Sequence, residues 1–330
     1  MSNSKGVDVG TNMLVCGSII EDSTSFKMER DSFYKIIPKS DVNRNAIKMS
    51  LEKRGSNFIV DGNDFIVVGE DALQIAIERN DVARRPMSRG VISPKDRNNL
   101  PMLKLLLKTL VGQGSGDTKL VYSVPAKPID GDFDIVYHTE ILNMYFGELG
   151  YKAQPINEGF AIALSELLDE GLSGIAMSFG AGMVNVCVVH QGDQLVSFSI
   201  TRSGDYIDQA VGTALDISPS VVQLEKEAGV DLYNPTNKIM EAVCVYYNSV
   251  IDYVLKNIVY ELEIRSKRLP IFREPMPIIV AGGLTQATGF VRKVEERSSG
   301  IEWPLKVGKV RRAFSPYTTV ANGCLLAAQL

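Results

Sequence analysis

The strongest constraint on this chain is a pattern that occurs twice. Residues 6–20 have the pattern of an apolar strand, a glycine turn and a second strand, and residues 174–200 repeat it with one further strand. Residues 7–10 (VDVG) align with residues 177–180 (MSFG). A weak internal repeat of this kind predicts two related halves that each open with a strand–turn–strand unit. The length of 330 residues also suits two domains of ordinary size.

Charge and composition exclude several classes of protein. The net charge of −4 provides no basic field for nucleic acid, so no nucleic-acid partner is expected. The four widely spaced cysteines indicate neither a zinc ribbon nor a disulfide framework, which predicts a reducing, cytoplasmic location. No apolar run approaches the roughly 20 residues that span a bilayer, and the first strand begins too early for an N-terminal amphipathic helix. We therefore expect no signal peptide and no intrinsic membrane anchor.

Hydrophobic periodicity and turn residues predict the remaining elements. In the first half these are a third strand within 26–37, a hairpin over 57–69, helices over 71–79, around 103–110 and over 139–149, and a strand over 119–124. In the second half these are helices near 205–215 and over 238–262, a last buried strand over 277–281, and a C-terminal helix over 318–330.

Two glycine turns carry candidate phosphate-binding chemistry. In Asp8-Val9-Gly10-Thr11-Asn12, an Asp at a strand end can hold a hydrated metal ion, and the turn offers backbone N–H groups to phosphate oxygens. In Gly180-Ala181-Gly182-Met183, glycines allow the backbone to approach a phosphate closely. Each motif alone is equally compatible with an ordinary turn, since Asp and Gly suit turn backbones.

Two further motifs lie at predicted helix starts. Gly282 and Gly283 follow the strand 277–281, and a helix N-terminus there would suit the sugar or phosphate of a nucleotide. A close crossing of helix and strand would explain these glycines as well. Glu158, in the stretch INEGFA, could orient an attacking water, or it could be a helix-start carboxylate favoured by the helix dipole.

The order of these motifs resembles the actin-like ATPase superfamily, which includes actins, heat-shock chaperones and sugar kinases. Five segments of this chain match those of the superfamily, in the same order. They are the phosphate-one segment at 6–17, connect-one at 154–166, phosphate-two at 175–189, adenosine at 278–291 and connect-two at 316–328. The stretch RPMSRGVI (85–92) is similar to a sequence motif of MreB. The stretch TRSGDYID (201–208) is similar to a sequence motif that MreB and MamK share. The resemblance covers nearly the whole chain and favours the filament-forming bacterial actins.

The resemblance implies an α/β, ribonuclease H-like duplicated fold of two domains with a nucleotide cleft between them. Domain I would span 1–150, with a small subdomain at about 33–79, and the C-terminal helix 318–330 would pack back on it. Domain II would span 151–317, with a small subdomain at about 206–275.

The resemblance also implies ATP or ADP and Mg²⁺ as ligands. Asp8 would contact the hydrated Mg²⁺, and Glu158 would position the lytic water. The nucleotide would be held by the first turn (Gly10, Thr11, Asn12, Met13), by the second turn (Ser178, Gly180, Ala181, Gly182, Met183), by Glu225 and Lys226 near the base, and by Gly282, Gly283 and Leu284 along the adenosine.

Three positions depart from the superfamily pattern. Ser178 stands where the second phosphate turn usually opens with Asp, Met183 replaces the usual Thr, and Asn185 occupies a position that is often acidic. Losing one positioning group of this kind costs about 10²–10³ in rate. Either the nucleotide is hydrolysed slowly, or Ser178 still orients the waters of the metal and Glu158 suffices.

The leading functional interpretation is a filament protein that uses ATP as its assembly switch. Its subunits would associate head to tail, because such a contact generates an open helix when it does not close into a ring. One alternative is a small-molecule kinase of the same fold, although no Asp near the second turn offers a general base. Another is a non-hydrolysing adaptor similar to FtsA or PilM, which the missing carboxylate favours.

Overall fold

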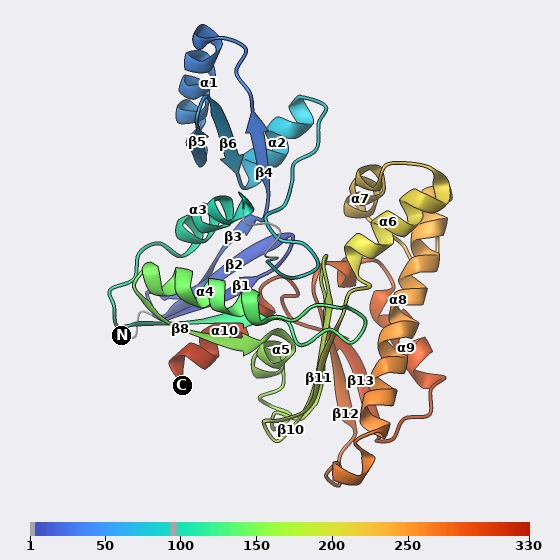
Figure 1. The fold of residues 1–330 in the computed structure, drawn as a ribbon. Helices are drawn as coiled ribbons and strands as arrows, with labels where there is room; N and C mark the ends of the chain where they lie inside the picture. The colour runs from blue at the N-terminus through green and yellow to red at the C-terminus, as the bar shows by residue number, and fades with distance from the viewer. Residues whose placement is uncertain (1–3, 93–97) are drawn as a thin grey trace.

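Two mixed five-stranded sheets form the framework of the molecule (Figure 1), and the computed structural model describes residues 4–92 and 98–330. The first sheet has the order β3-β2-β1-β7-β8, and the second has the order β11-β10-β9-β12-β13. The strands of the first sheet are β1 (Lys5–Val9), β2 (Met13–Ile20), β3 (Ser23–Arg30), β7 (Thr118–Val124) and β8 (Tyr151–Asn157). Those of the second are β9 (Gly174–Phe179), β10 (Val184–His190), β11 (Asp193–Ile200), β12 (Met276–Ala281) and β13 (Val307–Arg312).

The two sheets share one pattern of strand directions. Strand β1 pairs with β2 antiparallel and with β7 parallel, and β9 pairs in the same way with β10 and β12. The outer strands continue the pattern, since β3 is antiparallel to β2, and β11 is antiparallel to β10. The two related halves that the sequence repeat predicts, and the duplicated α/β fold that the resemblance implies, are therefore confirmed.

Two helices of small residues lie between the sheets. These helices, α5 (Glu158–Glu166) and α10 (Thr319–Gln329), share one core with side chains of both sheets, including Val121 of β7 and Ala176 of β9. They cross closely at Gly323, where a Cβ atom would collide with the backbone of Ala161. This close packing brings the ends of β1 and β9 toward the same helix N-terminus, that of α5.

A smaller sheet extends the first half. It has the order β4-β6-β5 and carries its own core of buried residues, including Phe65 and Leu51. This unit consists of β4 (Phe33–Ile36), α1 (Asp41–Arg54), β5 (Phe58–Asp61), β6 (Asp64–Val68) and α2 (Glu70–Glu78). Helices α3 (Leu100–Val111) and α4 (Val136–Glu148) contribute to the core of the first sheet.

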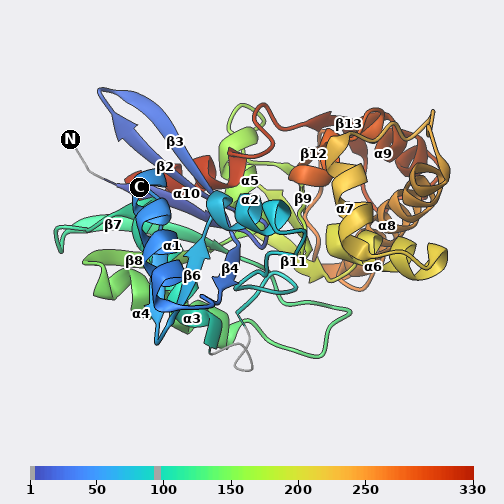
Figure 2. The same cartoon turned by 90° about the horizontal axis from the view of Figure 1, so that it is seen from above.

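Helices cover the outer face of the second sheet. The longest, α8 (Lys238–Glu263), buries a continuous apolar stripe that includes Val243, Tyr247 and Val254. Helix α9 (Phe290–Ser299) packs beside α8, and α6 (Gly204–Leu215) and α7 (Pro219–Ala228) lie beyond the end of the sheet against the upper part of α8 (Figure 1). Two short 3-10 turns complete this half, η2 (Ser266–Arg268) and η3 (Gly283–Gln286). Seen from above, α6 and α7 lie across from α2 and β4 of the first half (Figure 2). None of the helices in the described residues is long and apolar enough to cross a membrane.

The structure corrects several expectations. The predicted strand within 26–37 is two strands, β3 and β4, because the chain leaves the first sheet at Asp31, whose backbone N–H donates to the Asn12 carbonyl (3.0 Å). Strand β13, in which only Val310 is buried, follows the strand 277–281 and was not predicted. Helix α1 was missed because it buries only Leu51 and so lacks an apolar period. Strand β8 pairs with β7, so we propose a boundary of the first half near residue 157 rather than 150.

Candidate functional site

A cavity of about 480 Å³ opens between the two halves and is lined by both. It includes the turn after β1, the turn after β9, the start of α5 and the turn after β12. Of the residues predicted from the sequence, those that line this cavity are Asp8, Gly10, Thr11, Asn12, Met13, Glu158, Ser178, Gly180, Ala181, Gly182, Met183, Lys226, Gly282, Gly283 and Leu284. Segments that are far apart in the chain therefore meet at one place.

The two predicted phosphate turns touch each other through Gly90. The backbone N–H of Gly90 donates to the hydroxyl of Thr11 in the first turn (3.0 Å). A Cβ atom at Gly182 in the second turn would lie 2.4 Å from the nitrogen of Gly90 and 2.5 Å from Oγ1 of Thr11. Only glycine fits at position 182 without moving the halves apart. A ligand bound by one turn would therefore lie within reach of the other.

Residues at the start of helix α6 donate hydrogen bonds to the carbonyl groups of the second turn. The hydroxyl of Ser203 donates to the Gly180 carbonyl (2.6 Å), and the backbone N–H of Asp205 donates to the Ala181 carbonyl (2.8 Å). Within the described part of the chain, the backbone N–H groups of Ala181 and Gly182 have no acceptor. Free N–H groups in a glycine turn are donors suited to phosphate oxygens.

Two carboxylates lie at the inner end of the cavity. Oδ1 of Asp8 accepts a hydrogen bond from Ser123 (2.9 Å), whose oxygen in turn accepts from the backbone N–H of Val9 (3.0 Å). Burial raises the pKa of Asp8, and the Ser123 hydrogen bond offsets part of this rise. Burial and the charge of Asp8 both raise the pKa of Glu158. The two acids thus share a poorly solvated region in which a cation or a hydrogen-bond donor would stabilise their charged forms.

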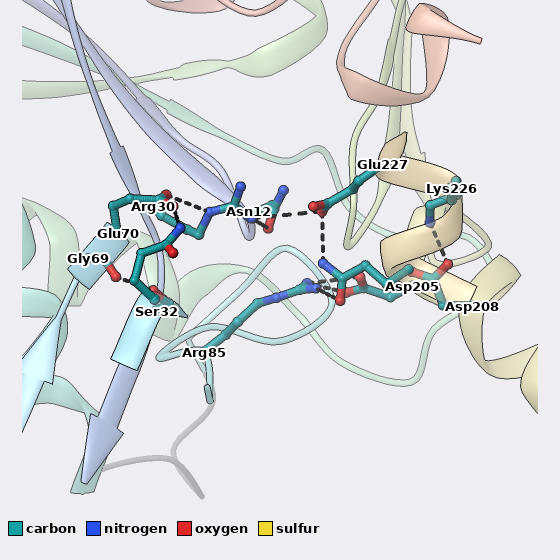
Figure 3. A network of polar contacts seen from close by, with 12 residues as sticks. Asn12, Arg30, Ser32, Gly69, Glu70, Arg85, Asp205, Asp208, Lys226 and Glu227 are labelled. Carbon is teal, nitrogen blue, oxygen red and sulfur yellow. Dashed lines mark hydrogen bonds and ion pairs between the residues drawn. The ribbon is translucent and has the colours of Figure 1, made fainter. Parts of the chain in front are cut away.

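Charged side chains bridge the two halves at the mouth of the cavity (Figure 3). Nη1 of Arg85 lies 2.8 and 2.9 Å from the two carboxylate oxygens of Asp205 in α6. Nη1 of Arg30 lies 3.8 Å from Glu227 in α7, and its Nε lies 3.1 Å from Glu70 of its own half. Sequence reasoning gave these residues no role. Arg85 and Asp205 occur in the two stretches that resemble MreB, but nothing local predicts that they pair.

Helix α7 presents one face to the cavity, and this explains why one predicted residue lies outside it. Gln223, Lys226 and Glu227 line the cavity because residues three and four apart share a helix face. Glu225 is not among the residues that line the cavity, and its carboxylate accepts a hydrogen bond from Nδ2 of Asn237 at 3.5 Å, so its contact with a nucleotide stays a prediction. Lys226 is nearly buried, and its amine lies 2.6 Å from Asp208.

At the far end of the cavity, two backbone segments approach each other closely at Gly282. Gly282 has a φ of 91°, and a Cβ atom there would lie 2.5 Å from the carbonyl oxygen of Phe179. Tyr317 and Tyr247 line the same cavity, which gives the site an aromatic wall that sequence reasoning missed. Tyr247 lies on the long helix α8 and is both buried in the core of the second half and in contact with the cavity at one side.

Comparison with known proteins gives the family. The family model of volactin, an actin-like family, matches residues 3–328. The chain belongs to the volactin family. A search of the curated proteins found no match.

Solved structures show that this volactin-family chain has the actin-like fold. A MamK double helical filament is 19% identical, with a TM-score of 0.73 over 99% of this chain and 98% of MamK. MreB 5 of Spiroplasma citri bound to AMPPNP is 14% identical, with a TM-score of 0.65 over 98% of this chain and 95% of that one. The ethanolamine utilization protein EutJ from Carboxydothermus hydrogenoformans is 15% identical, with a TM-score of 0.54 over 98% and 89%.

The donor set of this volactin-family site fits a hydrated Mg²⁺ ion held jointly with a phosphate. Mg²⁺ keeps several waters and is usually bound by one or two carboxylates together with substrate phosphates. Oδ2 of Asp8 has no hydrogen-bonding partner in the described residues, which leaves it available for such an ion. No group of three or more His, Cys, Asp or Glu residues that could hold a metal ion occurs in the described ranges.

Proposed function

We propose that this protein is a nucleotide-dependent, filament-forming actin-like protein that binds ATP with Mg²⁺ between its two halves. The observation that carries the proposal is the meeting of the turns 10–13 and 180–183, from opposite sheets, at a cavity that also contains Asp8 and Glu158. A polyphosphate between these turns would contact donors of both halves. The adenosine would extend toward Gly282 and the aromatic wall.

The side chains present suggest how each part would act. Asp8 would hold the Mg²⁺ through its waters, and the ion would neutralise charge on the phosphate oxygens. Glu158 would orient a water toward the terminal phosphate. Ser178 cannot supply the carboxylate usual at its position, and one missing positioning group costs about 10²–10³ in rate. Slow hydrolysis is therefore part of the proposal.

Assembly would follow from closure of the cleft. A ligand that contacts both turns favours the arrangement in which the halves are together, because it binds that state better than the open one. A head-to-tail contact between closed subunits then generates a filament if it does not close into a ring. One solved relative is described as a double helical MamK filament, and others are bound to AMPPNP or ADP, which supports this proposal. We propose a cytoplasmic location for this assembly.

Sedimentation with parallel phosphate release tests the proposal. Purified protein would be spun with ATP-Mg²⁺, AMPPNP-Mg²⁺, ADP-Mg²⁺ or no nucleotide, and the pellets imaged by negative stain. We expect filaments with ATP and AMPPNP and only slow release of phosphate. The matched control is Gly182→Gln, which would insert a side chain where the two turns touch and should abolish the nucleotide-dependent pellet.

Other outcomes point to other functions. Consumption of ATP that requires a small acceptor, without any pellet, would favour a kinase of the same fold. Nucleotide binding without hydrolysis or pelleting would favour an adaptor. Absence of nucleotide binding would overturn the proposal.

A further inference from the structure

Asn185 is a buried amide with two partners on opposite sides. It lies on β10 directly opposite Ser178 of β9 and is 1% exposed. Its Oδ1 accepts a hydrogen bond from the backbone N–H of Ala126 (3.0 Å), and its Nδ2 donates to Oε2 of Glu158 (2.8 Å). The side chain therefore connects the segment after β7, in the first half, to the start of α5.

The orientation of this amide is determined by its neighbours. A backbone N–H can only donate, so the oxygen of Asn185 must face Ala126 and the amino group must face Glu158. The segment at Ala126 is itself held, because its carbonyl accepts from the buried hydroxyl of Ser199 (2.7 Å). A rigid amide thus presents a donor, and never a charge, to the carboxylate.

We propose that Asn185 is a positioning residue for Glu158 in nucleotide hydrolysis, an inference that rests on the function proposed above. By holding one carboxylate oxygen, the amide fixes the side-chain rotamer of Glu158 and the direction in which its remaining lone pairs point. Ser178, directly opposite Asn185 on the neighbouring strand, lowers the pKa of Glu158 and so offsets part of the effect of burial. Neutral side chains thus stand at both positions where the resemblance implies acids in relatives.

A structural role for Asn185 would predict different effects from a positioning role. Asn185→Asp keeps an acceptor for Ala126 but replaces the donor to Glu158 with a like charge. Asn185→Ala removes both interactions. Ser199→Ala is the matched control, because it removes a buried hydrogen bond to the same residue, Ala126, without touching Glu158.

The test combines single-turnover phosphate release from ATP-Mg²⁺, binding of a fluorescent ATP analogue, and thermal unfolding of the full chain. We expect Asn185→Asp and Asn185→Ala to lower the hydrolysis rate by on the order of 10- to 100-fold, with nucleotide affinity changed by less than about threefold, since misplacing a catalytic group mainly affects the chemical step. Ser199→Ala should lower the melting temperature and leave the rate unchanged. The double variant with Glu158→Gln should be no slower than Glu158→Gln alone.

Unchanged rates in both Asn185 variants, an equal loss in Ser199→Ala, or additive losses in the double variant would each overturn the positioning role. A wild type that binds nucleotide but releases no phosphate would overturn hydrolysis itself, and the positioning role with it. A wild type that binds no nucleotide would overturn the proposed function as a whole.

Discussion

Arg85 and Asp205 form an ion pair across the mouth of the cleft, with one guanidinium nitrogen 2.8 and 2.9 Å from the two carboxylate oxygens. The backbone N–H of Asp205 also donates to the carbonyl of Ala181 in the second glycine turn. At the other end of the segment that carries Arg85, the N–H of Gly90 donates to Thr11 in the first turn. The segment 85–90 therefore contacts both glycine turns and links closure of the mouth to the geometry of the cavity.

Arg85→Ala should loosen the closed arrangement. The side chains of this pair are 22% and 29% exposed, so its contribution is about 1 kcal/mol at most, or roughly a fivefold shift toward the open form. Small-angle X-ray scattering of the nucleotide-free protein should show a larger radius of gyration. The control is Lys152→Ala, which breaks an exposed pair with Asp117 within the first half and should change nothing. An unchanged radius in Arg85→Ala would contradict this prediction.

Gly182→Ala should prevent the two turns from meeting. The added methyl group would lie 2.4 Å from the nitrogen of Gly90 and 2.5 Å from Thr11, so the halves must separate. We expect nucleotide affinity to fall about tenfold or more, because roughly 1.4 kcal/mol or more of closure energy would be lost. The control is Gly147→Ala in α4, where a Cβ atom has open space and should be neutral or stabilising. Equal affinities of the two variants, measured with a fluorescent nucleotide, would refute the contact.

Ser178→Asp should accelerate phosphate release. It restores a carboxylate at the entrance of the second turn, and a positioning group of this kind is worth about 10²–10³ in rate. The same change places a third acid near Asp8 and Glu158, whose pKa values burial already raises. Thermal unfolding should therefore occur at a lower temperature in EDTA and recover with ATP-Mg²⁺. A faster rate would show that Ser178 limits hydrolysis in the wild type, and an unchanged rate would show that Glu158 suffices.

His138 should make the protein sensitive to mild acid. Its Nδ1 accepts from the backbone N–H of Ile92 (3.2 Å), and burial lowers its pKa from 6.5 to about 4. The unfolded chain binds the proton more tightly, so stability present above pH 6.5 is lost as the pH falls toward 4. This loss amounts to about 3 kcal/mol at most.

His138→Asn isolates this effect, because an amide oxygen can accept from Ile92 but does not titrate in this range. Urea unfolding at several pH values should show a smaller loss of unfolding free energy in the variant than in the wild type between pH 6.5 and 4. Parallel losses in both proteins would assign the acid sensitivity to the carboxylates instead.

The sequence alone determined the duplicated fold and the segments that meet at the cavity. Apolar alternation and glycine turns are local signals, and they predicted β1, β2, β9 and β10 with the two turns between them. The superfamily resemblance added the order of the segments, and the structure brings these segments together. Polar elements such as α1 and α7 escaped prediction, because helices that bury one residue each have no apolar period to detect.

Tertiary structure alone decided which side chains face each other. Arg85 and Asp205 are 120 residues apart, and no local pattern specifies their pairing. The rotation of α7 turned Lys226 toward the cavity and Glu225 away from it, a choice that depends on packing against α6 and α8. The partners of Asn185 were likewise set by three segments that only the folded chain brings together. Local sequence fixes backbone conformation through short-range sterics and burial, whereas contacts between distant polar groups depend on how the two halves close.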